Sequence, residues 1–160
     1  EVIGVGKIYD IFAGKGIDRT TPNHGNHANM ERVFEIMKEE FDGLCYVNLV
    51  DTDMIYGHRR DIPGYAGALS EFDVQLGRML PGMKEDDILM ITADHGCDPG
   101  YRGTDHTREM VPLLVYGKSL PQNVDLGTRS TFADIAATIG AWFGLDYHGD
   151  GSPIRELLER

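Results

Sequence analysis

Cysteine, positive charge and long apolar runs are all scarce in this sequence, and each shortage excludes a class of protein. Only two cysteines occur, Cys45 and Cys97, too few for the disulfide framework of a small secreted domain. Both fall in or beside apolar runs, so we expect reduced thiols and a cytoplasmic location. No apolar run approaches the length of a transmembrane helix, and no signal-peptide pattern precedes the first one, so no membrane partner is expected.

Positive charge is outnumbered by negative charge. Lys and Arg together number 15 against 26 Asp and Glu, which gives a formal net charge of -11. A surface this acidic repels phosphate backbones and anionic lipid, so nucleic acid is not expected as a partner either. The 160 residues, of which 41% are hydrophobic, suffice for one domain with a real core, which we expect over residues 1–160.

Apolar runs of strand length alternate with amphipathic helical patterns along the chain. Patterns typical of buried strands occupy residues 1–8, 44–50, 87–91 and 111–117. Helical periodicity predicts helices over residues 30–41, 65–79 and 131–143, with a short terminal helix over 154–160. The Gly- and Asn-rich residues 9–28 are expected to form a loop. This alternation predicts an α/β fold, with a mostly parallel sheet and helices on both faces.

Asp94 and His95 stand directly after one of the expected strands, and Gly96 lets the chain turn at once. In open α/β sheets, ligands gather at the carboxyl ends of the strands. An adjacent carboxylate and imidazole suit Zn²⁺, Mn²⁺ or Fe²⁺. A helix-capping carboxylate and a hydrogen-bonded core histidine are the alternatives for an isolated pair of this kind.

A second group of the same chemistry favours the metal interpretation. Asp53 and His58 also follow an expected buried strand, and His106 follows a Gly-rich loop that could fold it back towards Asp94 and His95. Packing alone does not require two strands that each deliver Asp and His at their carboxyl ends. Asp53, His58 and His106 would form a site with one carboxylate, two imidazoles and open positions, and Asp94 with His95 would form half of another.

Other polar residues have weaker signals. Lys7 follows the first strand and could reach an anion as a compact point charge, although an exposed lysine at a strand end is the simpler interpretation. His24 and His27 have no partner motif, and we interpret them as surface residues.

Three strings resemble the phosphopentomutases, a family of the alkaline phosphatase superfamily. They are residues 51–61, 92–99 and 104–117. The Asp-His-Gly pattern is shared across that superfamily, whereas Tyr-Gly-His-Arg-Arg-Asp and Asp-His-Gly-Cys-Asp-Pro are much narrower. The opening Ile-Gly-Val-Gly-Lys-Ile also resembles the family, so the resemblance covers nearly the whole chain. It implies a partial alkaline-phosphatase-like core.

The resemblance implies a function and assigns residues to it. The family interconverts ribose 1-phosphate and ribose 5-phosphate, and the deoxyribose equivalents, with two Mn²⁺ ions, for which Zn²⁺ or Mg²⁺ are the substitutes. A pentose phosphate is then the expected substrate. The ligands implied for one metal are Asp53, His58 and His106, and those implied for the other are Asp94 and His95. Lys7 corresponds to a lysine near the substrate.

The sequence also departs from the family. Family members are considerably longer, and their N-terminal part supplies a further metal-binding Asp, a nucleophilic Thr and a cap domain. No threonine here lies in the nucleophile context, and the sequence begins on a strand without Met. We therefore expect a C-terminal part of the catalytic core that has no catalytic nucleophile, is inactive by itself, and forms a homo-oligomer through exposed apolar surface. Alternatives are another superfamily enzyme, phosphoglycerate mutase-like or a phosphodiesterase, and a non-catalytic metal-binding domain.

Overall fold

The computed structural model describes residues 1–158, which divide into two compact units. The first unit comprises Glu1–Met83 and Thr92–Leu113. The second comprises Lys84–Ile91 and the chain from Leu114 onward. The expectation of a single domain over residues 1–160 stays a prediction.

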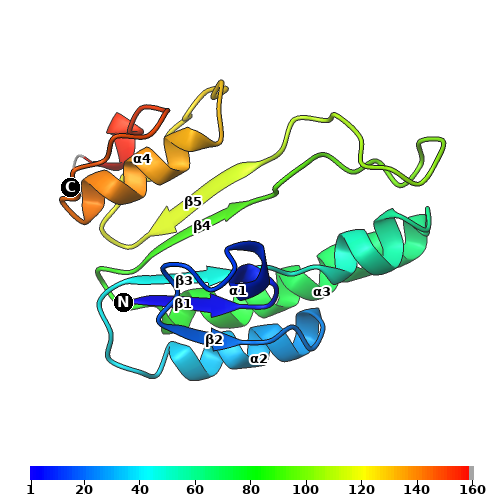
Figure 1. Ribbon diagram of the computed structural model, residues 1–160, viewed down its shortest axis with the longest axis horizontal. Coiled ribbons are helices and arrows are strands. Elements are labelled where there is room, and N and C mark those ends of the chain that lie inside the picture. Colours follow the sequence, from blue (N-terminus) through cyan, green and yellow to red (C-terminus); the bar gives the residue numbers. More distant parts are fainter. Residues whose placement is uncertain (159–160) are drawn as a thin grey trace. The chain divides into compact units, whose positions relative to one another are not determined.

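A three-stranded parallel sheet forms the centre of the first unit (Figure 1). Strand β1 (Val2–Val5) lies between β2 (Arg19–Thr21) and β3 (Leu44–Val47) and pairs with both in parallel. Ile3 and Val5 of β1 are buried, because an apolar central strand has neighbours on both edges and both faces. The sheet is therefore built around the first apolar run of the sequence.

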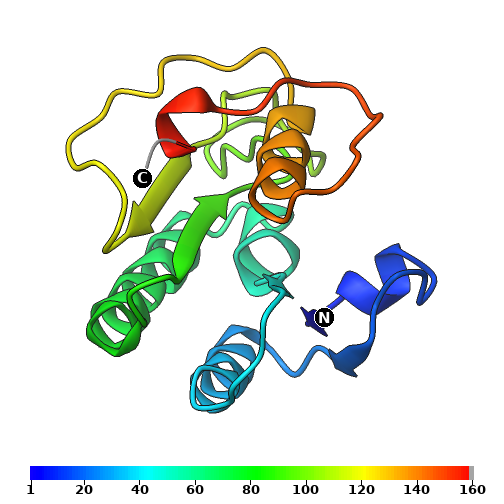
Figure 2. The ribbon, with the colours of Figure 1, turned by 90° about the vertical axis from the view of Figure 1, so that its left-hand side faces the viewer.

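Helices cover both faces of this sheet. Figure 2 shows α1 (Ile8–Ile11) on one side and α2 (Asn26–Ile36) on the other. Ile8 is buried on the first side, and Ile36 packs with the core of β1 on the second. The predicted α/β class, with a parallel sheet between helices, is confirmed.

Arg78 of helix α3 (Ile62–Met79) contacts two residues of α2. The guanidinium of Arg78 lies 4.5 Å from the centre of the Phe34 ring and donates a hydrogen bond to Glu31 at 3.0 Å. A cation above an aromatic face combines apolar contact with electrostatic attraction. A 3-10 turn, η2 (Leu80–Gly82), follows the end of α3.

The second unit contains a strand pair and a helix. In Figure 1 the arrows of β4 (Ile88–Thr92) and β5 (Leu113–Gly117) run in opposite directions, and these strands form a two-stranded sheet of their own. Helix α4 (Ala133–Trp142) is followed by η3 (Arg155–Leu157). The Trp142 indole joins the two, because its Nε1 donates to the Leu157 carbonyl at 3.1 Å.

Two sequence expectations need correction. Residues 9–28 are not a plain loop, because they include most of α1, all of β2 and the start of α2. β2 has only three residues and no apolar run, so pairing with β1 defines it. The terminal helix expected over 154–160 is the short turn η3, and residues 159–160 lie outside the described residues. In the described part of the chain, no helix combines the length and apolarity needed to cross a membrane.

Candidate metal centre

A π-helical turn, η1 (Thr52–Gly57), follows β3 and carries the first ligand candidates. The backbone N–H of His58 donates to the carbonyl of Asp53 at 2.9 Å, which is the five-residue spacing of a π turn. In an α-helix with 3.6 residues per turn, side chains five residues apart point about 140° away from each other. The wider turn brings Asp53 and His58 to the same face.

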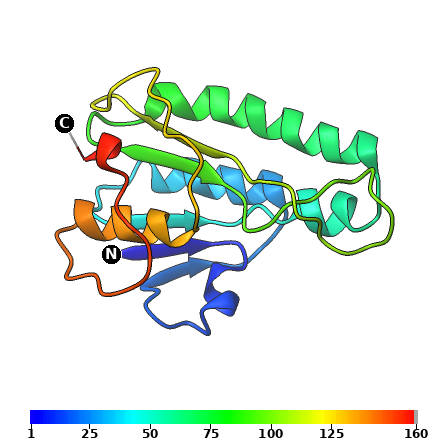
Figure 3. The same cartoon turned by 90° about the horizontal axis from the view of Figure 1, so that it is seen from above.

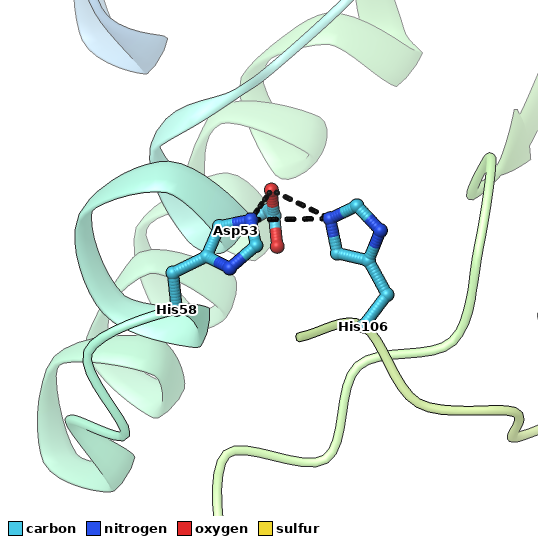
Figure 4. A group of neighbouring side chains, drawn as sticks. All are labelled: Asp53, His58 and His106. Carbon is cyan, nitrogen blue, oxygen red and sulfur yellow. Dashed lines mark hydrogen bonds and ion pairs between the residues drawn. The ribbon is translucent and has the colours of Figure 1, made fainter. Parts of the chain in front are cut away.

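Asp53, His58 and His106 converge on one point (Figure 4). Asp53 Oδ2 lies 3.3 Å from His58 Nε2 and 3.6 Å from His106 Nε2, and the two Nε2 atoms are 3.1 Å apart. Within the described residues, this is the group of three or more His, Cys, Asp or Glu side chains close enough to hold one metal ion. The same three residues were predicted from the sequence to form one site.

The loop that carries His106 is closed by contacts between its two ends. Thr107 forms an isolated antiparallel bridge with Gly96, with Thr107 N–H donating to the Gly96 carbonyl at 3.1 Å. The Thr107 hydroxyl accepts from the Asp98 N–H at 2.6 Å. A Cβ at Gly96 would lie 2.5 Å from the backbone nitrogen of Glu109, so only glycine allows this close approach. In Figure 3 the loop of residues 96–109 lies beside η1.

Backbone carbonyls fix the tautomers of two imidazoles. His58 Nδ1 is hydrogen-bonded to the Thr104 carbonyl, and His95 Nδ1 is 3.1 Å from the Gly96 carbonyl. A carbonyl oxygen only accepts hydrogen bonds, so both Nδ1 atoms are the donors. The neutral ring then has its lone pair on Nε2, and His58 directs this atom at Asp53 and His106.

The three donors fit a metal ion in geometry and chemistry. Two ligands about 2.1 Å from a tetrahedral Zn²⁺ are about 3.4 Å apart. The observed separations of 3.1, 3.3 and 3.6 Å surround this value. Asp53 Oδ1 is buried and has no hydrogen-bond partner within the described residues, a costly state for a carboxylate oxygen that a bound cation would remove. One carboxylate and two imidazoles suit Zn²⁺ or Mn²⁺.

The pKa values of two neighbouring groups show that this side of η1 is partly dehydrated and negative. Burial raises the pKa of the Cys97 thiol, and the charge of Asp53 raises it further. Burial also raises the pKa of Tyr65, again with a contribution from Asp53. Both shifts disfavour additional negative charge, as expected for partly buried groups beside a carboxylate.

Asp94 and His95, the second pair expected from the sequence, lie beside the first three residues. His95 Nε2 is 3.6 Å from Asp94 Oδ1, and the His95 ring stacks on His106 with 3.6 Å between ring centres. The Asp94 side chain is 75% exposed, so solvent surrounds the carboxylate. The two predicted ligand sets are adjacent, and their ligand assignments stay predictions.

Lys7 lies next to η1 without joining the ligand cluster. The lysine is half-buried after β1, and its Nζ contacts Met54, the residue after Asp53. Its assignment to the substrate stays a prediction. His27, expected at the surface without a partner, is exposed and pairs with Glu71 of α3 at 3.0 Å.

Sequence reasoning left Asp51 without a role, although it stands two residues before Asp53. Asp51 Oδ2 accepts from the backbone N–H of Asn26, the first residue of α2, at 2.7 Å. The Asn26 side chain returns the contact by accepting from the Asp51 N–H at 3.0 Å. A carboxylate at a helix N-terminus satisfies a free N–H and the helix dipole. Asp51 thereby connects the end of β3 to α2 and supports the start of η1.

The fold and the site together define an α/β protein with a cluster of candidate metal ligands after the carboxyl end of a parallel strand. The model of the Metalloenzyme superfamily matches residues 5–147, and the chain belongs to this superfamily.

Within this superfamily, the chain is similar to curated phosphopentomutases. The chain is 53% identical over 151 residues to the phosphopentomutase of Acetivibrio thermocellus, covering 94% of the chain and 39% of that relative. It is 58% identical over 140 residues to that of Limosilactobacillus reuteri (strain DSM 20016), covering 87% and 35%. It is 50% identical over 160 residues to that of Clostridium novyi (strain NT), covering 99% and 41%. The chain thus spans about two fifths of the length of these relatives.

Proposed function

We propose that this chain forms the metal-binding part of the catalytic core of a phosphopentomutase, an isomerase that interconverts (deoxy)ribose 1-phosphate and (deoxy)ribose 5-phosphate. The cluster of Asp53, His58 and His106 carries this proposal, because it is a three-ligand group in a chain of the Metalloenzyme superfamily. Identity of 50–58% to phosphopentomutases over most of the chain supports this particular reaction. A pentose phosphate is the proposed substrate.

Two Mn²⁺ ions are the proposed cofactors, with Zn²⁺ or Mg²⁺ as substitutes. Asp53, His58 and His106 would hold one ion, and Asp94 with His95 would hold part of the shell of the other. When bound, such ions neutralise the charge that develops on a transferring phosphoryl group. The chain itself presents the Nε2 lone pair of His58, whose Nδ1 is hydrogen-bonded to the Thr104 carbonyl, and Oδ2 of Asp53, 3.3 Å from that Nε2.

Lys7 is the proposed substrate residue. Its ammonium is a compact charge that binds phosphate without fixed geometry. The contact with Met54 places it beside the π turn that carries Asp53, and a thioether is a weak partner that a phosphate oxygen would displace.

The nucleophile is the part of the reaction that these 160 residues do not supply. Thr107, next to His106, has its hydroxyl engaged by the Asp98 N–H, so it supports the loop. Positioning of reacting groups dominates phosphoryl transfer. We therefore propose that the 160-residue chain alone is inactive. Both cysteines are free, which supports the cytoplasmic location that belongs to the same proposal.

Titration of the 160-residue chain with Mn²⁺ by calorimetry tests the metal centre. We expect one clearly tighter equivalent at the site of Asp53, His58 and His106, and its loss in His106→Ala. This loss should exceed the about 10- to 100-fold that removal of an outer-shell partner costs. Asp94→Asn, which changes a solvent-exposed carboxylate of the other set, is the matched control and should retain the tight equivalent. Retention in His106→Ala with loss in Asp94→Asn would show that the ligands are divided differently.

A second experiment tests the reaction. The purified chain should not convert ribose 5-phosphate into ribose 1-phosphate in excess Mn²⁺. Turnover at about 1 per second, in the ordinary range of enzymes, would disprove the proposed inactivity.

A further inference from the structure

Arg60 connects the two segments that carry the metal-ligand candidates. It stands two residues after His58, and its guanidinium reaches the distant loop around His106. Nη1 donates to the Asp98 carbonyl at 2.8 Å, Nη2 donates to the Asp105 carbonyl at 2.7 Å, and Nε donates to the Gly103 carbonyl. All three donor nitrogens of the side chain are thus engaged with backbone.

Two of the three carbonyls that accept from Arg60 lie beside residues that contact or carry the ligand candidates. Gly103 and Asp105 flank Thr104, whose carbonyl fixes the His58 tautomer. Asp105 is also the residue before His106. One guanidinium therefore holds in place both the acceptor for His58 and the backbone of His106. The planar fork of five N–H groups does this with a fixed geometry that a lysine ammonium lacks.

The backbone of Arg60 shows that its position is specified by these contacts. Its φ is +56°, in the left-handed region that residues other than Gly, Asn and Asp seldom occupy. Such a conformation persists where surrounding interactions outweigh its cost. Three side-chain hydrogen bonds to one loop are interactions of that kind.

We propose that Arg60 is a positioning residue that assembles the metal site by clamping the loop of residues 98–106 onto η1. This rests on the proposed function only in taking Asp53, His58 and His106 as the ligands. Arg60 does not touch the ion; it acts through His106 and through the Thr104 carbonyl. Without the clamp, the two His ligands belong to segments that 46–48 residues of chain separate, and the entropy of bringing them together opposes binding.

The test compares charge-matched substitutions at two neighbouring arginines. Arg60→Lys keeps the charge and loses the fork, whereas Arg59→Lys makes the same change at an exposed side chain. Mn²⁺ affinity is measured by calorimetry on the 160-residue chain, with the unfolding midpoint measured without metal. We expect about 10- to 100-fold weaker binding in Arg60→Lys and unchanged binding in Arg59→Lys. Arg60→Gly, which suits a positive φ, should fold and bind as weakly as Arg60→Lys.

Amide hydrogen exchange gives a readout that does not depend on metal. In Arg60→Lys, exchange should accelerate within residues 98–106 and stay unchanged in β1 and α2. Wild-type exchange in this loop, or wild-type Mn²⁺ affinity in the folded variants, would overturn the positioning role while leaving the metal centre intact. A wild-type chain that binds no Mn²⁺ would overturn the metal centre and the role of Arg60 toward it, and exchange would then show only whether Arg60 holds the loop.

Discussion

The imidazole rings of His95 and His106 are stacked, with their centres 3.6 Å apart and their planes inclined by 18°. They come from opposite sides of the Gly96–Thr107 bridge, which brings the two ends of the loop together. His106 belongs to the proposed three-ligand set and His95 to the neighbouring pair. Each ring therefore limits the rotation of the other, so the two sets are coupled by packing.

This stack predicts a difference between two substitutions of His95. His95→Phe keeps a flat ring against His106 and removes the nitrogen donors, whereas His95→Ala removes both. Calorimetry with Mn²⁺ should show nearly wild-type affinity at the tight site for His95→Phe and weaker binding for His95→Ala. Equal, strong loss in both variants would mean that a His95 nitrogen belongs to the tight site.

A side chain at Gly57, the last residue of η1, would clash with its neighbours. A Cβ there would lie 2.6 Å from Cys97 Sγ and 3.2 Å from Asp53 Oδ1. Gly57→Ala should therefore lower stability by about 1–3 kcal/mol, as overpacking does, and displace Asp53, which weakens Mn²⁺ binding. Gly67→Ala is the control, because a Cβ at Gly67 meets nothing within 4 Å, and it should stabilise α3 by up to about 1 kcal/mol. Adding Cys97→Ala should partly rescue Gly57→Ala; no rescue would refute the proposed clash.

The raised pKa of the Cys45 thiol leads us to expect a loss of folding stability at high pH. Burial raises the pKa of this thiol from 9.0 to about 11. The folded state thus favours the neutral thiol, and its contribution is complete below pH 9.0 and is lost as pH rises towards 11. At pH 10 this loss is about 1 kcal/mol. Urea midpoints at pH 7.5 and pH 10 should show a smaller decrease for Cys45→Ala than for wild type, and equal decreases would contradict the shift.

The lowered pKa of Asp134 leads us to expect a loss of stability at low pH in the second unit. Its carboxylate accepts from the Ser152 N–H at 2.9 Å and from Arg129 at 2.8 Å, and these partners lower its pKa below the ordinary 3.8. Its contribution is therefore present above pH 3.8 and lost as pH falls through the lowered pKa. Asp134→Asn should lower the thermal midpoint at pH 7, whereas Asp146→Asn, at a carboxylate that is 90% exposed, should not. Equal midpoints would mean that this network contributes little.

Exposed apolar side chains predict association in solution. Leu69 and Val74 of α3 are more than half exposed, as is Met110 in the loop before β5. Apolar surface of this kind drives association unless another chain segment covers it. Light scattering on the 160-residue chain should show dimers or larger species despite the net charge of -11. A single monomeric species at high concentration would contradict this prediction.

The candidate ligands were predictable because residue type and position after an apolar run can both be read from a short stretch of sequence. Apolar runs ending in Asp and His predict strands that deliver donors at one edge, and all five residues named for metal binding lie at or beside the cluster. Helices α3 and α4 were predicted from their apolar periodicity in the same way. Their existence depends on spacing along the chain, and spacing is fully visible in a sequence.

Tertiary structure alone decided the contacts across long sequence separations. The sequence does not show that Arg60 reaches across 38–45 residues to bind three carbonyls, that Asp51 accepts from the first N–H of α2, or that His95 stacks on His106. β2 was missed for the same reason, since its three residues become a strand only by pairing with β1. A local sequence pattern shows which side chains stand at the end of a strand or on one face of a helix. Hydrogen bonds between distant segments depend on the path of the folded backbone, which no single window of sequence contains.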